Sequence, residues 1–117
     1  MPTIRDLVAA LRQREGVDAA VVLGRDGLLI DSQTDAAVDA ESIAALVPSI
    51  VSAADEFGGH NGRGPLTTAI LEYTEGVALV SVLSNDAILL VLARPTADLG
   101  RLLYELRRNR ENIATLV

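Results

Sequence analysis

Three apolar runs between residues 66 and 93 are separated by very short turns, and this spacing constrains the fold more than any other feature of the sequence. The runs are LTTAILEYT, VALVSVLS and AILLVLA, and the turns between them are Glu75-Gly76 and Asn85-Asp86. Turns this short join antiparallel neighbours, whereas parallel strands need a long crossover. We therefore expect an antiparallel meander. Its last run is apolar throughout, which predicts a central strand buried on both faces.

The rest of the chain adds a hairpin and three amphipathic stretches. Residues 17–24 and 28–32 are apolar runs joined by Arg-Asp-Gly, which is a hairpin signal. Apolar side chains recur at helical spacing over residues 3–15, 40–57 and 97–115. The order αββαβββα predicts an α+β fold, in which the second helix covers one face of a five-stranded antiparallel sheet and the other two helices cover the opposite face. Nothing in the composition divides the 117 residues, so we expect a single domain.

The predicted helix ends depend on capping residues. Thr3, Asp39 and Thr96 precede the three helical patterns and are the expected N-caps. Gly58 follows the second pattern and is expected to end that helix. Pro48 lies inside the same pattern, where it removes a hydrogen bond and clashes with the preceding turn. We therefore expect the second helix either to kink at this residue or to start again there.

Composition and charge exclude several classes of protein. The chain has no cysteine, which rules out disulfide scaffolds, cysteine-bound zinc and thiol catalysis. No apolar run is long enough to span a bilayer, and the charged N-terminus is unlike a signal peptide, so we expect a cytoplasmic protein without membrane insertion. The net charge of -6 disfavours nucleic acid as a partner. The segment from Asp26 to Ala93 contains ten acidic residues and only one arginine, Arg63, which predicts an acidic surface.

The glycine-rich stretch FGGHNGRGPLT, residues 57–67, does not fit a phosphate-binding loop. Such a loop follows a strand, precedes a helix and ends in Lys-Ser/Thr, but here the order is reversed and the chain contains no lysine. We interpret the stretch as a connector. The alternative is a mobile loop that touches a partner, with Arg63 as an arginine finger for a GTPase. His60 has no second histidine with which to form a metal site.

No constellation of residues predicts an enzyme active site, a metal site or a cofactor site. The acidic pairs Asp39/Glu41 and Asp55/Glu56 are interpreted as the solvated face of the second helix, because acid–base catalysis needs carboxylates that converge in a pocket. The serines have no base nearby in sequence. Three arginines near the end of the last helix are also interpreted as a solvated face: Arg107, Arg108 and Arg110.

Small side chains border the apolar stripe of the second helix and would let another helix approach closely. They are Ala44, Ala45, Ser49, Ser52 and Ala53. The run at residues 66–74 follows a long connector and is expected at the edge of the sheet, where unpaired backbone groups can pair with another chain. Together these features suggest a homodimer. The alternative is that the second helix packs only on its own sheet.

The arrangement resembles the Roadblock family, named for the roadblock-type dynein light chain, whose fold is of the Roadblock, longin and profilin type. The resemblance rests on the element order, on GVDAAVVLGRDGLLI as the first hairpin, and on AILLVLARPTADLGRLLYEL, where the last strand runs through a short link into a helix. It implies a homodimer whose second helices lie side by side while the third strands pair into one sheet. The dimer-interface residues expected on this basis are Ile43, Leu46, Val47, Ile50, Val51, Ala54, Leu66, Thr68, Ile70 and Glu72.

Bacterial members of this family, such as the gliding-motility protein MglB, act on small Ras-like GTPases without inserting an arginine of their own, which argues against Arg63 as a finger. The resemblance implies a GTPase-binding surface around the paired second helices, with Asp39, Glu41, Ser42, Ser49, Ser52, Asp55 and Glu56 as contacts. We therefore expect a GTPase-activating or GTPase-scaffolding regulator without an active site of its own. The alternatives are an adaptor in a motor, kinase or cytoskeletal complex and a small-molecule sensor, which would need a cavity.

Overall fold

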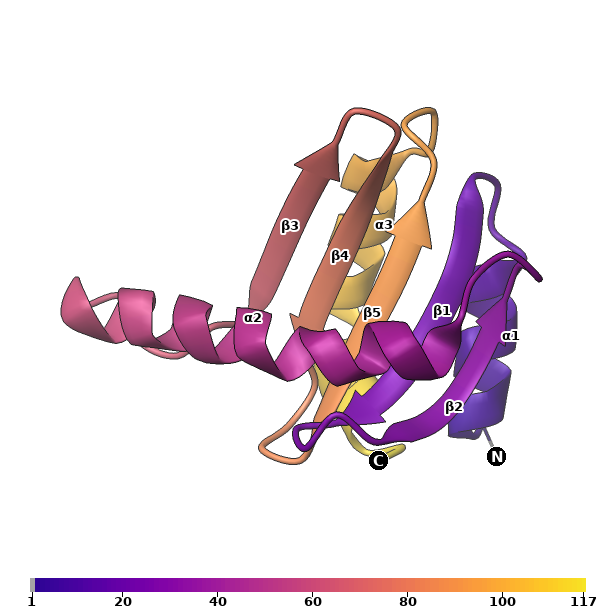
Figure 1. Cartoon of the computed structure of the whole chain (residues 1–117). Helices are drawn as coiled ribbons and strands as arrows, with labels where there is room; N and C mark the ends of the chain where they lie inside the picture. The colour runs from indigo at the N-terminus through magenta and orange to yellow at the C-terminus, as the bar shows by residue number, and fades with distance from the viewer. Residues whose placement is uncertain (1) are drawn as a thin grey trace.

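A computed structural model describes residues 2–117 and contains the predicted elements in the predicted order (Figure 1). The number of elements differs only at the last helix, which is divided at Asn109 into two helices. The elements are α1 (Ile4–Arg12), β1 (Val17–Gly24), β2 (Leu29–Thr34), α2 (Ala40–His60), β3 (Thr68–Tyr73), β4 (Gly76–Val82), β5 (Ala87–Ala93), α3 (Leu99–Arg108) and α4 (Arg110–Ala114).

The five strands form one antiparallel sheet in the order β2-β1-β5-β4-β3. β5 lies in the centre, and its residue Leu90 is paired with Val21 on one side and Val80 on the other. Six of the seven residues of β5 are buried, which confirms the prediction of a central strand. The meander is also confirmed, and it leaves β3 at the edge of the sheet.

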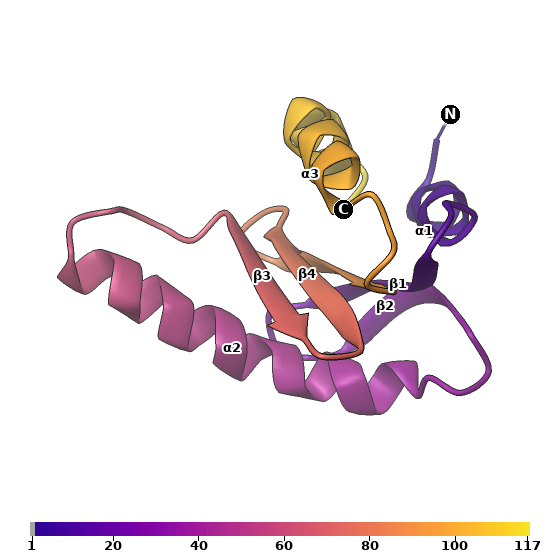
Figure 2. The ribbon, with the colours of Figure 1, turned by 90° about the horizontal axis from the view of Figure 1, so that it is seen from above.

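The helices form two layers, one on each face of the sheet, as predicted (Figure 2). Alternation along β1 divides the core between them. Ala19, Val21 and Leu23 pack on the α2 side, whereas Ala20 and Val22 pack on the side of α1, α3 and α4. Aliphatic side chains fill both cores, because the chain has only three aromatic residues. Within residues 2–117, no helix combines the length and apolarity that crossing a lipid bilayer requires.

The structure confirms two of the three predicted N-caps. Thr3 forms a reciprocal capping box with Asp6, and Asp39 caps α2 by accepting from the backbone N–H of Ser42. Thr96 is wrong as the cap of the last helix. Residues 94–97 form a turn, so that α3 begins later and Asp98 caps it by accepting from the backbone N–H of Arg101 at 3.0 Å.

α2 is a single helix of 21 residues that continues through Pro48, so the predicted restart at this residue is wrong. Gly27, at the tip of the β1–β2 turn with a φ of +87°, packs against the proline. A Cβ at Gly27 would lie 3.4 Å from Pro48 Cγ. The predicted end at Gly58 is also wrong, because the helix continues to His60 and Asn61 is its C-cap.

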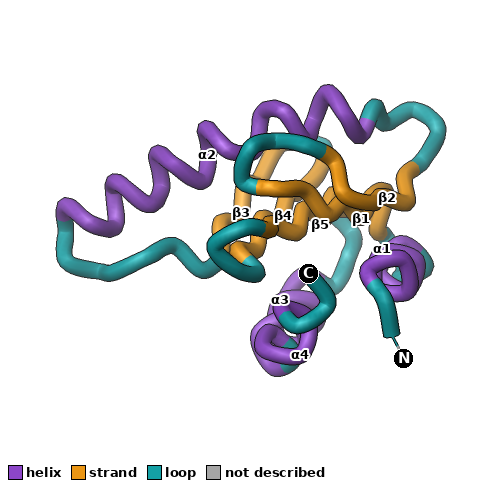
Figure 3. The backbone as a smooth tube through the Cα atoms, turned by 90° about the horizontal axis from the view of Figure 1, so that it is seen from below, coloured by secondary structure: helices purple, strands orange, loops and turns teal. Residues whose placement is uncertain are grey.

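The C-terminal part of α2 extends beyond the edge strand β3 (Figures 1 and 2). A helix of 21 residues is roughly 31 Å long, and its last buried residue is Val51. We call residues 52–60 the overhang. No residue of the overhang is fully buried. The glycine-rich connector, residues 61–67, runs beside the overhang back to β3 (Figure 3).

Candidate functional site

The outer edge of β3 has no partner strand in the part of the chain that the structure describes. β3 pairs only with β4, with Ile70 opposite Leu79 and Tyr73 opposite Gly76. Ile70 is 45% exposed and Tyr73 is 62% exposed. An exposed edge of this kind offers backbone donors and acceptors, flanked by apolar side chains, to another strand.

The outer surface of α2 leaves two further large apolar side chains in solvent. Leu46 is 68% exposed and Phe57, on the overhang, is 74% exposed. The stripe predicted from periodicity is therefore wider than the face that α2 buries. The residues of α2 that are fully buried against the sheet are Ala44, Val47 and Val51.

The residues predicted for a dimer interface are divided by the structure into three groups. Val47 and Val51 belong to the core beneath α2, where each is only 2% exposed. The half-buried members are Ile43, Ile50, Ala54, Leu66 and Thr68. Leu46, Ile70 and Glu72 are exposed. The last group is therefore directly available to a second chain.

Two of the predicted GTPase contacts, Asp39 and Ser42, form the N-terminal cap of α2. Asp39 accepts from the Ser42 hydroxyl at 2.7 Å and from the Ser42 backbone N–H at 3.3 Å. Both hydrogen bonds lower the pKa of the Asp39 carboxyl below its ordinary value, and the bond from the Ser42 hydroxyl has the larger effect. Glu41 in the same turn is exposed. This group of three lies at the opposite end of α2 from the overhang.

The other four predicted GTPase contacts lie together farther along α2. Ser49, Ser52, Asp55 and Glu56 line an open hollow between the helix and the β1–β2 turn, which contributes Arg25. Ser49, Ser52 and Glu56 are exposed. No cluster of three or more metal-binding side chains occurs among residues 2–117. The hollow therefore offers hydroxyl and carboxylate groups to a protein surface.

Asp55 makes bonds within the chain that its position in the sequence did not indicate. Its Oδ1 accepts from the backbone N–H of Leu66 at 2.6 Å, and its Oδ2 lies 3.5 Å from Nη1 of Arg25. The side chain is only 30% exposed. Sequence reasoning missed both partners, since they lie 11 residues after and 30 residues before Asp55.

The connector is bonded back onto the end of α2. The side-chain amide of Asn61 donates to the Phe57 carbonyl at 2.8 Å, and the backbone N–H of Arg63 donates to the Gly58 carbonyl at 2.9 Å. Gly62 and Gly64 have positive φ angles, which allow these close turns. The side chains of His60 and Arg63 are exposed. Because the stretch is hydrogen-bonded to the end of α2, these contacts favour a structural connector over a mobile loop.

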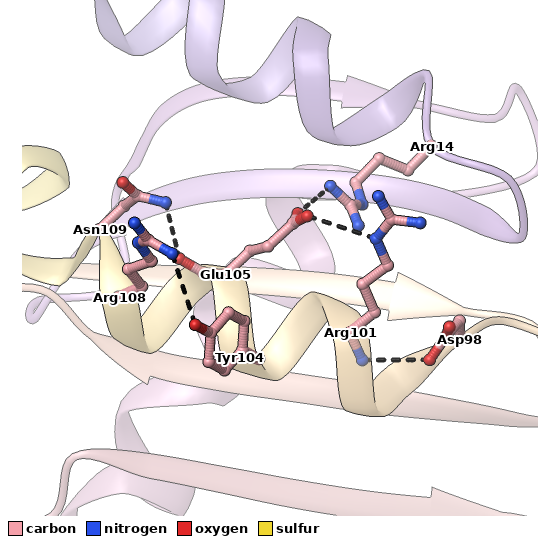
Figure 4. Close-up of polar contacts among 7 residues, drawn as sticks. All are labelled: Arg14, Asp98, Arg101, Tyr104, Glu105, Arg108 and Asn109. Atoms are coloured by element: carbon pink, nitrogen blue, oxygen red, sulfur yellow. Dashed lines mark hydrogen bonds and ion pairs between the residues drawn. The ribbon is translucent and has the colours of Figure 1, made fainter.

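On the opposite face of the sheet, the polar contacts of α3 are internal (Figure 4). Glu105 pairs with Arg14, which follows α1, and with Arg101 at 3.5 Å. Arg108 donates to the Tyr104 hydroxyl at 3.4 Å. Arg107 and Arg108 are exposed, but the prediction of a solvated Arg110 is wrong. Arg110 is half-buried and donates to the carbonyls of Thr67 and Val82.

Comparisons of the sequence and of the structure with known proteins both point to the Roadblock/LC7 domain. The family model of the Roadblock/LC7 domain matches residues 3–93. An uncharacterized protein of Methanocaldococcus jannaschii is 32% identical over 106 residues, which cover 91% of this chain and 92% of the relative. The crystal structure of a Roadblock/LC7 domain from Streptomyces avermitilis superposes with a TM-score of 0.84 at 25% identity, covering 96% of this chain and 95% of that one.

The gliding protein MglB of Thermus thermophilus has the same fold. Its structure superposes with a TM-score of 0.83 at 16% identity, and the match covers 96% of this chain and 86% of that one. At this level of identity the likeness shows the fold alone.

Proposed function

The chain belongs to the Roadblock/LC7 domain family, and on that premise we propose that it is a cytoplasmic, homodimeric regulator of a small Ras-like GTPase without an active site of its own. One observation carries the homodimer in this proposal, and the GTPase follows from the family: the unpaired edge of β3 lies beside the overhang of α2, which projects past it (Figure 1), and Phe57 on the overhang is exposed. A second copy brings the same two features to the interface.

The proposed dimer pairs the two β3 edges and brings the two α2 helices side by side. Antiparallel pairing of identical strands is isologous, so it closes after two copies. It would satisfy the outer backbone groups of β3 and cover Ile70, Leu46 and Phe57, all of which are exposed in the single chain. Ala45 and Ala53 are small and exposed on α2, which allows a neighbouring helix to approach closely.

The proposed GTPase surface is the polar side of α2 around the hollow. Ser49, Ser52 and Glu56 are exposed there and are free to contact a partner, as is Glu41 in the first turn. The mechanism is positional. The dimer holds the switch regions of the GTPase in an arrangement that permits hydrolysis or retains the GTPase at one place, while the residues and Mg²⁺ of the GTPase carry out the chemistry.

The dimer is tested by measuring mass against concentration with light scattering. We expect the wild type to be a dimer, and we expect Leu46→Glu together with Phe57→Glu to shift it toward the monomer, because both charges would be buried in the interface. The matched control is Tyr104→Glu, since Tyr104 is a large side chain of α3 that is 61% exposed on the other face. A monomeric wild type, or equal effects of both changes, would rule out this interface.

The GTPase is tested by affinity capture with the purified dimer, in parallel with GDP and with a non-hydrolysable GTP analogue. Enrichment of a small GTPase only with the analogue, followed by a change in its hydrolysis rate, supports the regulator. Glu56→Arg should weaken that binding, whereas Glu75→Arg in the β3–β4 turn serves as the control. Capture that does not depend on the nucleotide would favour an adaptor, and no GTPase in either arm would contradict the proposal.

A further inference from the structure

The overhang of α2 is helical although none of its residues is fully buried. A helix end of this kind frays unless other groups hold it, because helical stability in proteins comes mainly from packing. The structure supplies such groups from the connector, which turns back after Asn61 and runs beside the overhang (Figure 3). Besides the Asn61 bond to the Phe57 carbonyl, two contacts join the two segments, one at Leu66 and one at Arg63 and Gly64.

The first contact is the carboxylate of Asp55. It accepts the backbone N–H of Leu66 at 2.6 Å, just before β3 begins, and it also lies 3.5 Å from the guanidinium of Arg25 in the β1–β2 turn. One side chain of the overhang therefore bonds both to the segment that leads into the edge strand and to the β1–β2 turn at the same end of the sheet.

The second contact is a close backbone approach at Gly58. A Cβ on this residue would lie 2.8 Å from the carbonyl oxygen of Gly64, a distance that real Cβ atoms do not adopt. The Gly58 carbonyl also accepts from the backbone N–H of Arg63 at 2.9 Å. Gly59 is the next residue of the same helix, and a Cβ there would meet nothing within 4 Å. The glycine is therefore required at only one of these two positions.

We propose that Asp55 and Gly58 are positioning residues, which set the direction of the overhang relative to β3 so that both can meet the second copy at once. The inference rests on the proposed dimer. It assigns Asp55 an internal role instead of the GTPase contact expected from the sequence. Preorganisation of this kind increases affinity because less ordering remains to be done on association.

The test compares Gly58→Ala with Gly59→Ala, which make the same chemical change at adjacent positions of the same helix. We expect Gly58→Ala to raise the dimer Kd about tenfold or more, and to accelerate amide hydrogen exchange in residues 61–67, because the connector must move away. Gly59→Ala should change neither quantity. Equal effects of the two variants on Kd and exchange would overturn the inference.

A second pair of variants addresses the carboxylate without altering the helix backbone. Asp55→Asn keeps an oxygen that can accept from Leu66 N–H, whereas Asp55→Ala does not. We expect the alanine variant to weaken the dimer and to increase exchange at Leu66, and the asparagine variant to restore most of both. Failure of asparagine to restore them, with alanine disruptive, would assign the effect to the Arg25 pair and overturn the role given to the Leu66 bond.

The two proposals fail in different ways. If the wild type does not dimerise, the proposed function and the inference that rests on it are both overturned. If the wild type dimerises and Gly58→Ala and Asp55→Ala dimerise equally well, the proposed function stands and the inference alone is wrong.

Discussion

The guanidinium of Arg110 in α4 donates a hydrogen bond of 2.6 Å to the carbonyl of Val82, the last residue of β4. It donates a second bond of 3.2 Å to the carbonyl of Thr67, which also accepts from the Val82 N–H at 2.9 Å. The short helix at the C-terminal end of the described chain is thereby joined to the start of the edge strand. These are charge-assisted bonds to carbonyl groups at the rim of the sheet.

We expect Arg110→Ala to lower the free energy of unfolding by about 1–3 kcal/mol, because a bond to a charged group is lost and backbone acceptors are left without it. Urea unfolding monitored by circular dichroism measures this change. Arg107→Ala is the matched control, since Arg107 is exposed on α3. Equal losses in the two variants would show that the carbonyl bonds of Arg110 contribute little.

The ion pairs of Glu105 should contribute modestly and in a salt-dependent way. Glu105 is 34% exposed and joins Arg14 to α3 (Figure 4). We expect Glu105→Gln to reduce the free energy of unfolding by about 0.2–1 kcal/mol at low salt, the range for solvent-exposed ion pairs. The loss should shrink at roughly 1 M NaCl, where charges are screened within a few ångströms. Glu111→Gln on the exposed side of α4 is the comparison, and a loss that does not respond to salt would contradict the ionic interpretation.

Asp39 should make stability depend on pH in the acid range. Its folded pKa is lowered by the Ser42 hydrogen bonds, so the stabilisation is fully present above the unfolded pKa of about 3.9 and is lost as pH falls through the folded value. The stability difference between wild type and Asp39→Ala should therefore be constant near neutral pH and decrease below about pH 4. Ser42→Ala should weaken this dependence, and a difference that stays constant into acid would contradict the assignment.

Pro48→Ala should stabilise the protein. Pro48 has no N–H, so the Ala44 carbonyl lacks the donor that α2 would otherwise supply, although the helix continues past it. Restoring that donor should raise the free energy of unfolding by about 1–3 kcal/mol. Ser49→Ala gives the baseline for a gain in helix propensity alone. A decrease in the melting temperature would mean that the contact between Pro48 and Gly27 contributes more than the missing hydrogen bond.

Local patterns were sufficient to predict the fold because each depends on neighbouring residues. Very short turns permit only antiparallel pairing, so the meander follows from the turn signals at residues 75–76 and 85–86. In the structure the first turn consists of Thr74 and Glu75, because Gly76 is already paired with Tyr73. Asp39 caps α2 because its carboxylate reaches a backbone N–H three residues away. Where two local signals compete, prediction was less successful. Thr96 and Asp98 are both residue types that commonly cap helices, and the turn at residues 94–97 leaves Asp98 as the cap.

The sequence did not show which of the predicted interface and GTPase-binding residues are buried and which are exposed. Helical periodicity marks Leu46, Val47 and Phe57 as one stripe, but only Val47 is buried beneath α2. The width of the buried face depends on the direction in which α2 crosses the sheet, because the helix projects beyond the edge strand β3 and is not covered there. The early end assigned at Gly58 concealed the overhang, since a glycine after an apolar residue is also the usual sign of a helix C-terminus.

The sequence by itself determined the order of the elements, the antiparallel meander, the two helix layers and the resemblance to the Roadblock family, because periodicity, turns and caps act over a few residues. Only the tertiary structure decided that α2 continues past β3, that Asp55 bonds to Leu66, and that Gly58 must be glycine. Those outcomes depend on the path by which the connector returns, which brings together groups that no periodic pattern relates.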